Sequence, residues 1–384
     1  MSHSIPYGKQ NITDEDIHAV ITTLKSDFLT QGPMVKEFED NFAHYVGAKY
    51  AVTVCNATAS LHLAHLALGT TSGKKVITSP NTFVATANSV LYSGGEIEFA
   101  DIDPKTYCLD PNRVEDLIKK NPRSYAGISP IDFAGHPARL EDFRVIARKF
   151  GLWIIEDACH APGAYFTSST GIQKIGNGHF SDIAIFSFHP VKHIACGEGG
   201  MLTTNSKELY QKLIQLRTHG ITKDRSRMEH YDGGWDYEMQ MLGYNYRISD
   251  ILCALGNSQL SRAENSLQKR EAIAKRYSEE LAHLPILLPT VENGSRHAFH
   301  LYVIRSKKRK ALFEHLKNKC IYTQVHYIPV HKQPFYLDRY GRQNFDVAES
   351  YYEECLSIPM YPSLTEDEQI KVIEEIKFFY KDHV

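Results

Sequence analysis

Lys192 is the residue of this sequence whose surroundings are best suited to covalent chemistry. It follows the apolar run 183–188, which has the length and composition of a buried strand. Pro190 ends any hydrogen-bonded ladder there, and a glycine-containing loop leads to a second apolar run at 201–204. A lysine kept out of water has a lowered pKa, and its neutral amine attacks carbonyl carbons. The alternative is a solvated lysine in a hairpin loop, the commoner setting for a single lysine.

Asp157 stands next to the carboxyl end of another apolar run, 152–155. Open α/β sheets bind their ligands at the carboxyl ends of their strands. A carboxylate placed there can keep a pyridine nitrogen protonated, which is the ion pair that makes pyridoxal phosphate an electron sink. Capping of a following helix is the alternative role for an aspartate at such a turn.

A third feature is the turn after the apolar run 52–54, which passes through small polar residues into a helical pattern. The free N–H groups and the dipole of a helix start attract anions, and the Thr58 and Ser60 hydroxyls add donors. Taken alone, this turn would be read as ordinary helix capping. An anion seat, then a carboxylate beyond a strand, then a lysine between strands indicate a single cofactor site.

The elements that must position these groups alternate along the chain from about residue 50 to residue 216. Such alternation predicts an α/β fold with a mostly parallel sheet wrapped by helices. The last two strands are joined by a short loop, so one edge is expected to pair antiparallel. The predicted strands are 52–54, 76–78, 97–99, 126–131, 152–155, 183–188 and 201–204, with helices at 58–68, 83–92, 111–120, 139–150 and 205–216.

Flanking segments complete the predicted organisation. An amphipathic helix with Ile17, Val20, Ile21 and Leu24 on one face is capped by Thr13. A second helix follows Pro33 and ends near Gly47, and the polar, aromatic stretch 217–246 is expected to be a surface loop unless a partner covers it. The pattern at 249–284 predicts a helix long enough to bridge two domains. A strand at 299–304 and helices at 310–318 and 366–380 follow, which divides the chain into 1–259, carrying the cofactor site, and a smaller α/β domain, 260–384.

Composition excludes several classes of protein. The 384 residues carry a formal net charge of −2, with 42% hydrophobic and 23% charged residues. These values predict no nucleic-acid or membrane partner. Seven scattered cysteines without a Cys-x-x-Cys pair predict free thiols and a cytoplasmic location. His189 and His193 are four residues apart, but Pro190 and the glycines argue against a helix there, so no metal site is predicted.

Seven segments, in order, make the chain resemble the sugar aminotransferases of the DegT/DnrJ/EryC1/StrS family over nearly its whole length. That resemblance implies a fold-type-I enzyme dependent on pyridoxal 5'-phosphate (PLP), which becomes pyridoxamine 5'-phosphate (PMP) in half of the cycle. The segments are LTQGP at 29–33, NATA at 56–59, FVATAN at 83–88, EDACHA at 156–161, SFHPVK at 187–192, GEGG at 197–200 and GYNYR at 243–247.

The resemblance implies roles for residues at the reacting end of the cofactor. Lys192 would bond to the cofactor and then move a proton between carbon and nitrogen. Asp157 would pair with the pyridine nitrogen, and Phe83 would lie flat on the ring, unless it is an ordinary core aromatic. His160 matches a position near the ring hydroxyl. Family members with histidine in place of Lys192 are dehydratases, so the lysine indicates transamination.

The resemblance also implies a phosphate seat and a homodimer. Backbone groups of Thr58 and Ala59, with the Ser187 hydroxyl, would hold the phosphate. Asn245 matches a residue that reaches the phosphate from the neighbouring subunit, which implies active sites shared between two subunits. Ala57 replaces the glycine common in the family, and the stretch 166–178 is longer than in many members.

The implied reaction transfers nitrogen from an amino acid, expected to be glutamate, which leaves as 2-oxoglutarate, to a keto sugar on a nucleotide diphosphate. Segments around 29–32, 254–260 and 324–330 look most like enzymes that aminate C4 of a UDP-linked 4-keto-6-deoxy-N-acetyl-hexosamine in pseudaminic acid biosynthesis. The alternatives are 4-amination of bacillosamine- or legionaminic-type precursors, 3-amination of a dTDP sugar, or a cofactor-binding protein without turnover. Candidate substrate contacts, each with a structural role as the alternative, are Tyr7, Arg247, His326, Tyr327 and His331.

Overall fold

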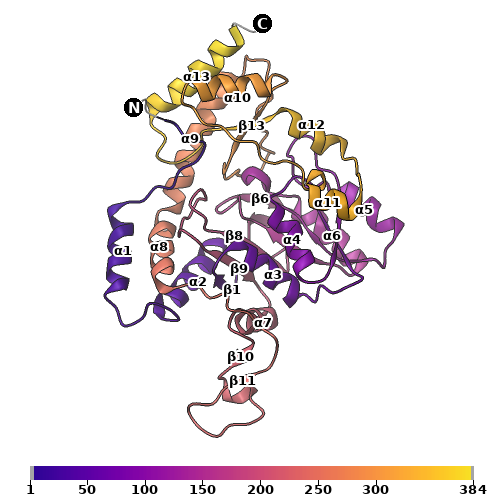
Figure 1. Ribbon diagram of the computed structural model, residues 1–384, viewed down its shortest axis with the longest axis vertical. Helices are drawn as coiled ribbons and strands as arrows, with labels where there is room; N and C mark the ends of the chain where they lie inside the picture. The colour runs from indigo at the N-terminus through magenta and orange to yellow at the C-terminus, as the bar shows by residue number, and fades with distance from the viewer. Residues whose placement is uncertain (1–3, 382–384) are drawn as a thin grey trace.

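The computed structural model describes residues 4–381 and is built around a seven-stranded sheet (Figure 1). Five neighbouring strands run parallel, which confirms the predicted α/β fold. All seven predicted strands are present. In sheet order they are β1 (Tyr50–Val54), β9 (Gly200–Thr204), β8 (Ile183–Ser187), β5 (Trp153–Asp157), β4 (Tyr125–Ser129), β2 (Lys75–Thr78) and β3 (Glu96–Phe99).

The predicted antiparallel pairing at one edge of the sheet is confirmed, and it involves three strands. β9 pairs antiparallel with β8 on one side and with β1 on the other, so β9 is internal and β1 is the edge strand. The reason is topological, because the short loop after β8 turns the chain back beside it, and the sequence-distant β1 then covers the free side of β9.

Helices cover both faces of the sheet. Side chains alternate between the faces along β8, since Ile183 and Ile185 belong to one buried cluster and Ala184 and Phe186 to another. The helices beside Ile185 are α3 (Ala57–Ala67), α4 (Val84–Tyr92) and α7 (Lys207–Arg217). Those on the Phe186 face are α2 (Pro33–Val46), α5 (Pro111–Lys120), α6 (Leu140–Phe150) and α8 (Asp250–Ser261).

The predicted helix at 249–284 is divided in two. Arg262 leaves helical geometry between α8 and α9 (Ala263–Leu281). α9 leads to a second cluster of buried side chains, which includes Ile5 from the other end of the chain. That cluster packs around the antiparallel pair β12 (Tyr302–Arg305) and β13 (Cys355–Ile358) and the helices α10 (Arg309–Asn318) and α13 (Glu366–Lys381). A division of the chain at 259/260 stays a prediction.

The first helix, α1 (Asp14–Leu24), is capped at Thr13 as predicted, and its Asp16 carboxylate accepts from the Thr13 N–H at 2.9 Å. Asp16 is fully buried and paired with Arg262, which fixes α1 beside α8. The apolar face of α1 is left uncovered, since Ile17, Ile21 and Leu24 are 49%, 43% and 53% exposed.

The stretch 217–246 projects from the sheet at the lower end of Figure 1. It contains the short pair β10 (Ile221–Thr222) and β11 (Glu238–Met239) and one 3-10 turn, η2 (Arg225–Arg227), and it exposes Trp235 and Leu242. The sequence did not predict the hairpin of β6 (Tyr165–Ser168) and β7 (Gly171–Lys174), nor helices α11 (Pro334–Tyr340) and α12 (Asp346–Glu354).

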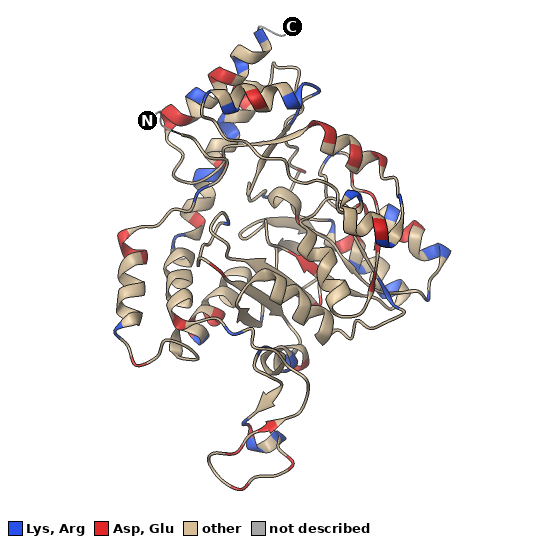
Figure 2. Cartoon of the chain, in the orientation of Figure 1, with Lys and Arg blue, Asp and Glu red and all other residues tan. Residues whose placement is uncertain are grey.

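Acidic and basic side chains are interspersed along the outer helices α10 and α13, in keeping with the nearly neutral net charge (Figure 2). Within the described residues, 4–381, no helix combines the length and apolarity needed to cross a membrane.

Candidate active site

A cavity of about 670 Å³ opens beyond the carboxyl ends of β5 and β8. Three stretches that the sequence singled out meet there: the start of α3, the segment 157–160 after β5, and the loop 187–192 after β8. The segment 324–328, far along the chain, forms another part of the wall. The fold therefore brings the anion seat, the carboxylate and the lysine to one place.

Lys192 lines this cavity, and burial lowers the pKa of its amine to about 8, while the negative charge of Asp157 acts in the opposite direction. A lysine with a pKa near 8 is neutral in an appreciable fraction of molecules at neutral pH, so it can act as a nucleophile. Its Nζ lies 3.2 Å from the Nε2 of His300. Lys192 is thus half-buried at the wall of a cavity, as a candidate nucleophile should be.

Asp157 is the last residue of β5 and is 5% exposed. Its Oδ2 accepts a hydrogen bond from the Thr86 hydroxyl at 2.8 Å, and its Oδ1 accepts from the Cys159 N–H at 3.2 Å. No helix starts at this turn, so helix capping does not account for the carboxylate. Its two partners fix a carboxylate beside the cavity that also holds the Lys192 amine.

The start of α3 faces the cavity through Asn56, Ala57 and Thr58. The Asn56 side chain accepts from the Ala59 N–H at 2.8 Å, and Ala59 is 5% exposed and outside the cavity lining, so that N–H is committed to the cap. The other N–H groups of the first turn have no partner within the helix. β9 passes close by at Gly200, where a Cβ would lie 2.5 Å from the backbone of Asn56.

The tautomer of His160 follows from its partners. The Ala134 N–H donates to Nδ1 at 3.2 Å, and burial lowers the pKa of the ring, so the neutral imidazole carries its hydrogen on Nε2. Nε2 lies 3.2 Å from the Tyr327 hydroxyl oxygen and donates to it. The Tyr327 hydrogen is then free to point into the cavity. Phe83, 58% exposed, presents its ring at the same cavity.

Comparison with known proteins identifies the family. Residues 10–377 match the model of the DegT/DnrJ/EryC1/StrS aminotransferase family. The chain belongs to this family. It is therefore an aminotransferase, as the resemblance in its motifs predicted.

Individual members of the family are similar to the chain over its whole length. Spore coat polysaccharide biosynthesis protein SpsC of Bacillus subtilis is 38% identical over an alignment of 390 residues that covers 99% of this chain and 98% of SpsC. UDP-4-amino-4,6-dideoxy-N-acetyl-beta-L-altrosamine transaminase of Campylobacter jejuni is 36% identical over an alignment of 389 residues that covers 98% of this chain and 99% of the relative. The structure of Helicobacter pylori PseC, an aminotransferase involved in the biosynthesis of pseudoaminic acid, superposes with a TM-score of 0.90. It is 28% identical, and the match covers 99% of this chain and 100% of PseC.

DegT/DnrJ/EryC1/StrS aminotransferases depend on PLP, and solved sugar aminotransferases of this fold exist in PLP and PMP forms. The residues of this chain fit that cofactor. An amine with a pKa near 8, a buried carboxylate and an open helix start surround one cavity, and Gly200 leaves room where a side chain would collide with that helix start. Ser187, at the end of β8, also lines the cavity.

The candidate substrate contacts of this aminotransferase fall into two groups. Tyr7 and His326 line the cavity with their rings 5.5 Å apart, and Tyr327 lies beside them. His331 is outside the lining, buried, with its Nε2 3.1 Å from a carboxylate oxygen of Glu349. The structure therefore gives His331 a partner within the protein and does not bring it to the site.

Asn245 and Arg247 also lie outside the lining of this chain's cavity. They belong to the projecting stretch and its junction with the sheet, where Asn245 pairs with Thr218. The sequence interpretation missed Thr86 and His300, both of which line the cavity. Thr86 lies within the FVATAN segment, but its partnership with a residue 71 positions away is visible only in three dimensions.

Proposed function

We propose that this aminotransferase moves an amino group from glutamate to C4 of a UDP-linked 4-keto-6-deoxy-N-acetyl-hexosamine. The observation that carries the proposal is the Lys192 amine, with its lowered pKa, on the same cavity as the buried Asp157 carboxylate. The similarity to the C. jejuni transaminase and to PseC supports the choice of sugar.

Each residue has a role that follows from its surroundings. When bound, PLP supplies an electron sink and carries the nitrogen between the two substrates. Lys192 would be the nucleophile that binds the cofactor and the acid/base that moves a proton at the reacting carbon. Asp157, fixed by Thr86, keeps a positive charge on the pyridine nitrogen, and the exposed face of Phe83 is available to stack on the ring.

The start of α3 is suited to bind an anion. Thr58 and Ser187 both line the cavity, and the free N–H groups of a helix start attract negative charge. We therefore assign the cofactor phosphate to Thr58 and Ser187. Ala59 contributes through the cap, which stabilises the helix start. His160 directs Tyr327 towards the ring end of the cofactor, and Tyr7 and His326 are placed to meet the sugar nucleotide.

A homodimer completes the proposed site. The uncovered apolar side chains of α1 and the exposed Trp235 and Leu242 of the projecting stretch are the surfaces that a second copy would cover. Asn245 is exposed in the single chain, which suits a residue that reaches the phosphate of the neighbouring subunit. The seven cysteines are free thiols, in keeping with a cytoplasmic enzyme.

A panel of keto sugars tests the function. The purified protein with PLP is incubated with glutamate and, separately, with UDP-4-keto-6-deoxy-N-acetyl-hexosamines of different stereochemistry, a bacillosamine-type precursor and dTDP-3-keto and dTDP-4-keto sugars. Nuclear magnetic resonance of each product locates the new amino group. We expect amination at C4 of a UDP-linked substrate to be the most efficient reaction. Preference for a dTDP-3-keto sugar would replace the proposed substrate, and absence of turnover with every sugar would overturn the function.

A further inference from the structure

His300 contacts the Lys192 amine, and it belongs to the C-terminal part of the chain, which follows all the motifs. It lies in the segment 297–300 before β12, which no motif of the sequence singled out. Its ring is 5% exposed, lines the main cavity and stands 3.2 Å from Lys192 Nζ through Nε2. We propose that His300 is a positioning residue whose Nε2 accepts a hydrogen bond from the free Lys192 amine and holds that amine towards the cavity.

The second nitrogen of His300 supports this role. Nδ1 is buried and has no hydrogen-bond partner among residues 4–381. Burying an unpaired polar atom costs free energy, and an apolar side chain of similar size would avoid that cost. Packing alone therefore does not explain a histidine here, whereas its contact with the Lys192 amine does.

The backbone around His300 is held in a conformation that costs free energy. Phe299, immediately before it, has a φ of +45°, a left-handed backbone conformation that residues other than glycine rarely adopt. The fully buried guanidinium of Arg270 donates to the carbonyl oxygens of Phe299 at 3.1 Å and Met360 at 3.0 Å. These contacts fix the direction in which the His300 ring leaves the chain, and that direction is towards Lys192.

Among residues 4–381, His300 is the side chain within hydrogen-bond distance of the Lys192 amine. The other groups around the amine act on it in different ways. Asp157 acts on Lys192 through its negative charge, and Arg270 acts on it through its positive charge. Burial keeps His160, His193 and His326 neutral. The lysine is free of the cofactor whenever the nitrogen resides on PMP, so this proposal, which rests on the proposed function, applies to that half of the cycle.

The test measures how fast the full-length protein, stripped of cofactor, recaptures PLP at a series of pH values. Capture needs the neutral amine, so the midpoint of the profile reports the pKa of Lys192. The accepted hydrogen bond stabilises the ammonium form, and His300→Leu removes it. We expect the midpoint to fall by about one pH unit in that variant and the rate at high pH to fall about tenfold, because the amine is no longer oriented.

Two amide variants separate positioning from packing. The glutamine oxygen or nitrogen of His300→Gln reaches the place of Nε2, whereas the shorter side chain of His300→Asn reaches only the place of Nδ1. We expect the Gln variant to keep a midpoint close to that of the natural protein and the Asn variant to resemble His300→Leu. Equal midpoints in all three variants and the natural chain would overturn the proposal.

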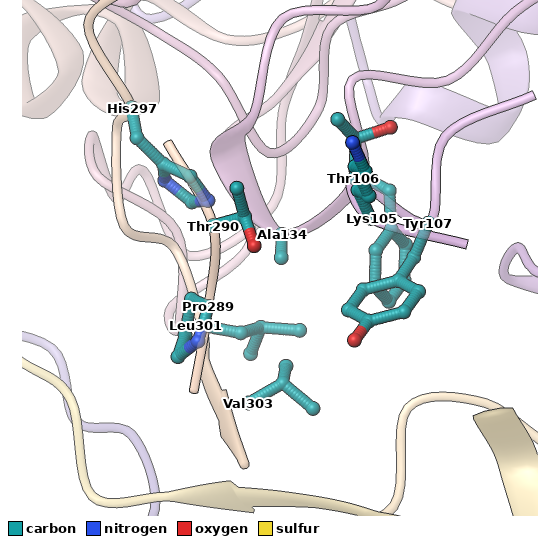
Figure 3. A pocket seen from close by; sticks show the side chains of 10 residues that line it. Lys105, Thr106, Tyr107, Ala134, Pro289, Thr290, His297, Leu301 and Val303 are labelled. Atoms are coloured by element: carbon teal, nitrogen blue, oxygen red, sulfur yellow. The ribbon is translucent and has the colours of Figure 1, made fainter. Parts of the chain in front are cut away.

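His297 provides the matched control. It is buried three residues earlier, accepts from the Phe299 N–H at 2.8 Å and faces a separate small cavity of about 20 Å³ beside Thr290 and Ala134 (Figure 3). His297→Asn keeps an acceptor at the place of Nδ1, and we expect an unchanged midpoint. A shift equal to that of His300→Leu would show a general effect of the segment and refute the assignment. Because no sugar is present, failure of sugar amination would overturn the proposed function without changing this result.

Discussion

Replacing Asp157 by asparagine removes one charge while keeping the shape of the site. The carboxylate accepts from the Cys159 N–H and the Thr86 hydroxyl. Asparagine can satisfy both contacts, since its oxygen accepts from Cys159 and its NH2 donates to a rotated Thr86 hydroxyl. Any loss of rate in Asp157→Asn is therefore an effect of charge and not of lost packing.

The size of that loss follows from burial. Asp157 is 5% exposed, and removing one partner of a buried ion pair costs about 3–5 kcal/mol. At about 1.4 kcal/mol for each factor of ten, kcat should fall by about 10²- to 10⁴-fold. The half-reaction with glutamate, followed in a single turnover by the cofactor absorbance, measures this rate without any sugar.

Two further measurements, the pH midpoint of PLP capture and the kcat of a second variant, make the test specific. The Asp157 charge raises the Lys192 pKa, so Asp157→Asn should move the pH midpoint of PLP capture below about 8. Thr86→Val keeps the charge and loses one hydrogen bond, and we expect a smaller effect, about tenfold on kcat. A variant Asp157→Asn that kept kcat within about threefold of the natural protein would refute the pairing with the pyridine nitrogen.

Three other predictions concern the phosphate seat, acid stability and assembly. Gly200→Ala places a methyl group 2.5 Å from the Asn56 backbone, so PLP affinity should fall by about tenfold or more in equilibrium titrations, while Gly199→Ala, with contacts beyond 3 Å, should have less effect. Burial lowers the pKa of His65 to about 3. Below pH 6.5, the His65 ring therefore binds a proton in the unfolded chain but stays neutral in the folded chain. The free energy of unfolding, measured with urea, should therefore decrease by about 1 kcal/mol from pH 6 to pH 5 on account of His65 alone, and His65→Gln should lessen the decrease. If the protein forms the proposed homodimer through the uncovered face of α1, Ile21→Asp should shift it towards the monomer in sedimentation, and a dimer unchanged by the substitution would place the interface elsewhere.

The main elements could be predicted from the sequence because each carries a local signal. Apolar runs marked all seven strands of the sheet, and Thr13 and Gly47 marked helix ends that the structure confirms. The hairpin of β6 and β7 was missed because its residues are largely exposed and lack an alternating apolar pattern. The break at Arg262 was missed because the helical pattern continues across it, while the side chain is held by the buried Asp16 at the other end of the chain.

Lys192 and Asp157 were identifiable because a lysine and a carboxylate beside buried strands are chemically unusual wherever they occur. The surroundings of other candidate site residues could not be predicted from the sequence, because packing between distant segments decides which partner each side chain contacts. His331 is adjacent in sequence to lining residues, yet it pairs with Glu349, and Ala59 follows Thr58, yet its N–H is taken by Asn56.

The amino-acid sequence was enough to predict the seven strands of the main sheet, the family and Lys192 as the candidate nucleophile, since these depend on local composition and on motifs along the chain. The internal position of β9 and the contacts of Thr86 with Asp157 and of His300 with Lys192 became visible in the folded chain. A hydrogen bond acts over about 3 Å in space, whereas these two pairs of residues are 71 and 108 positions apart in the sequence.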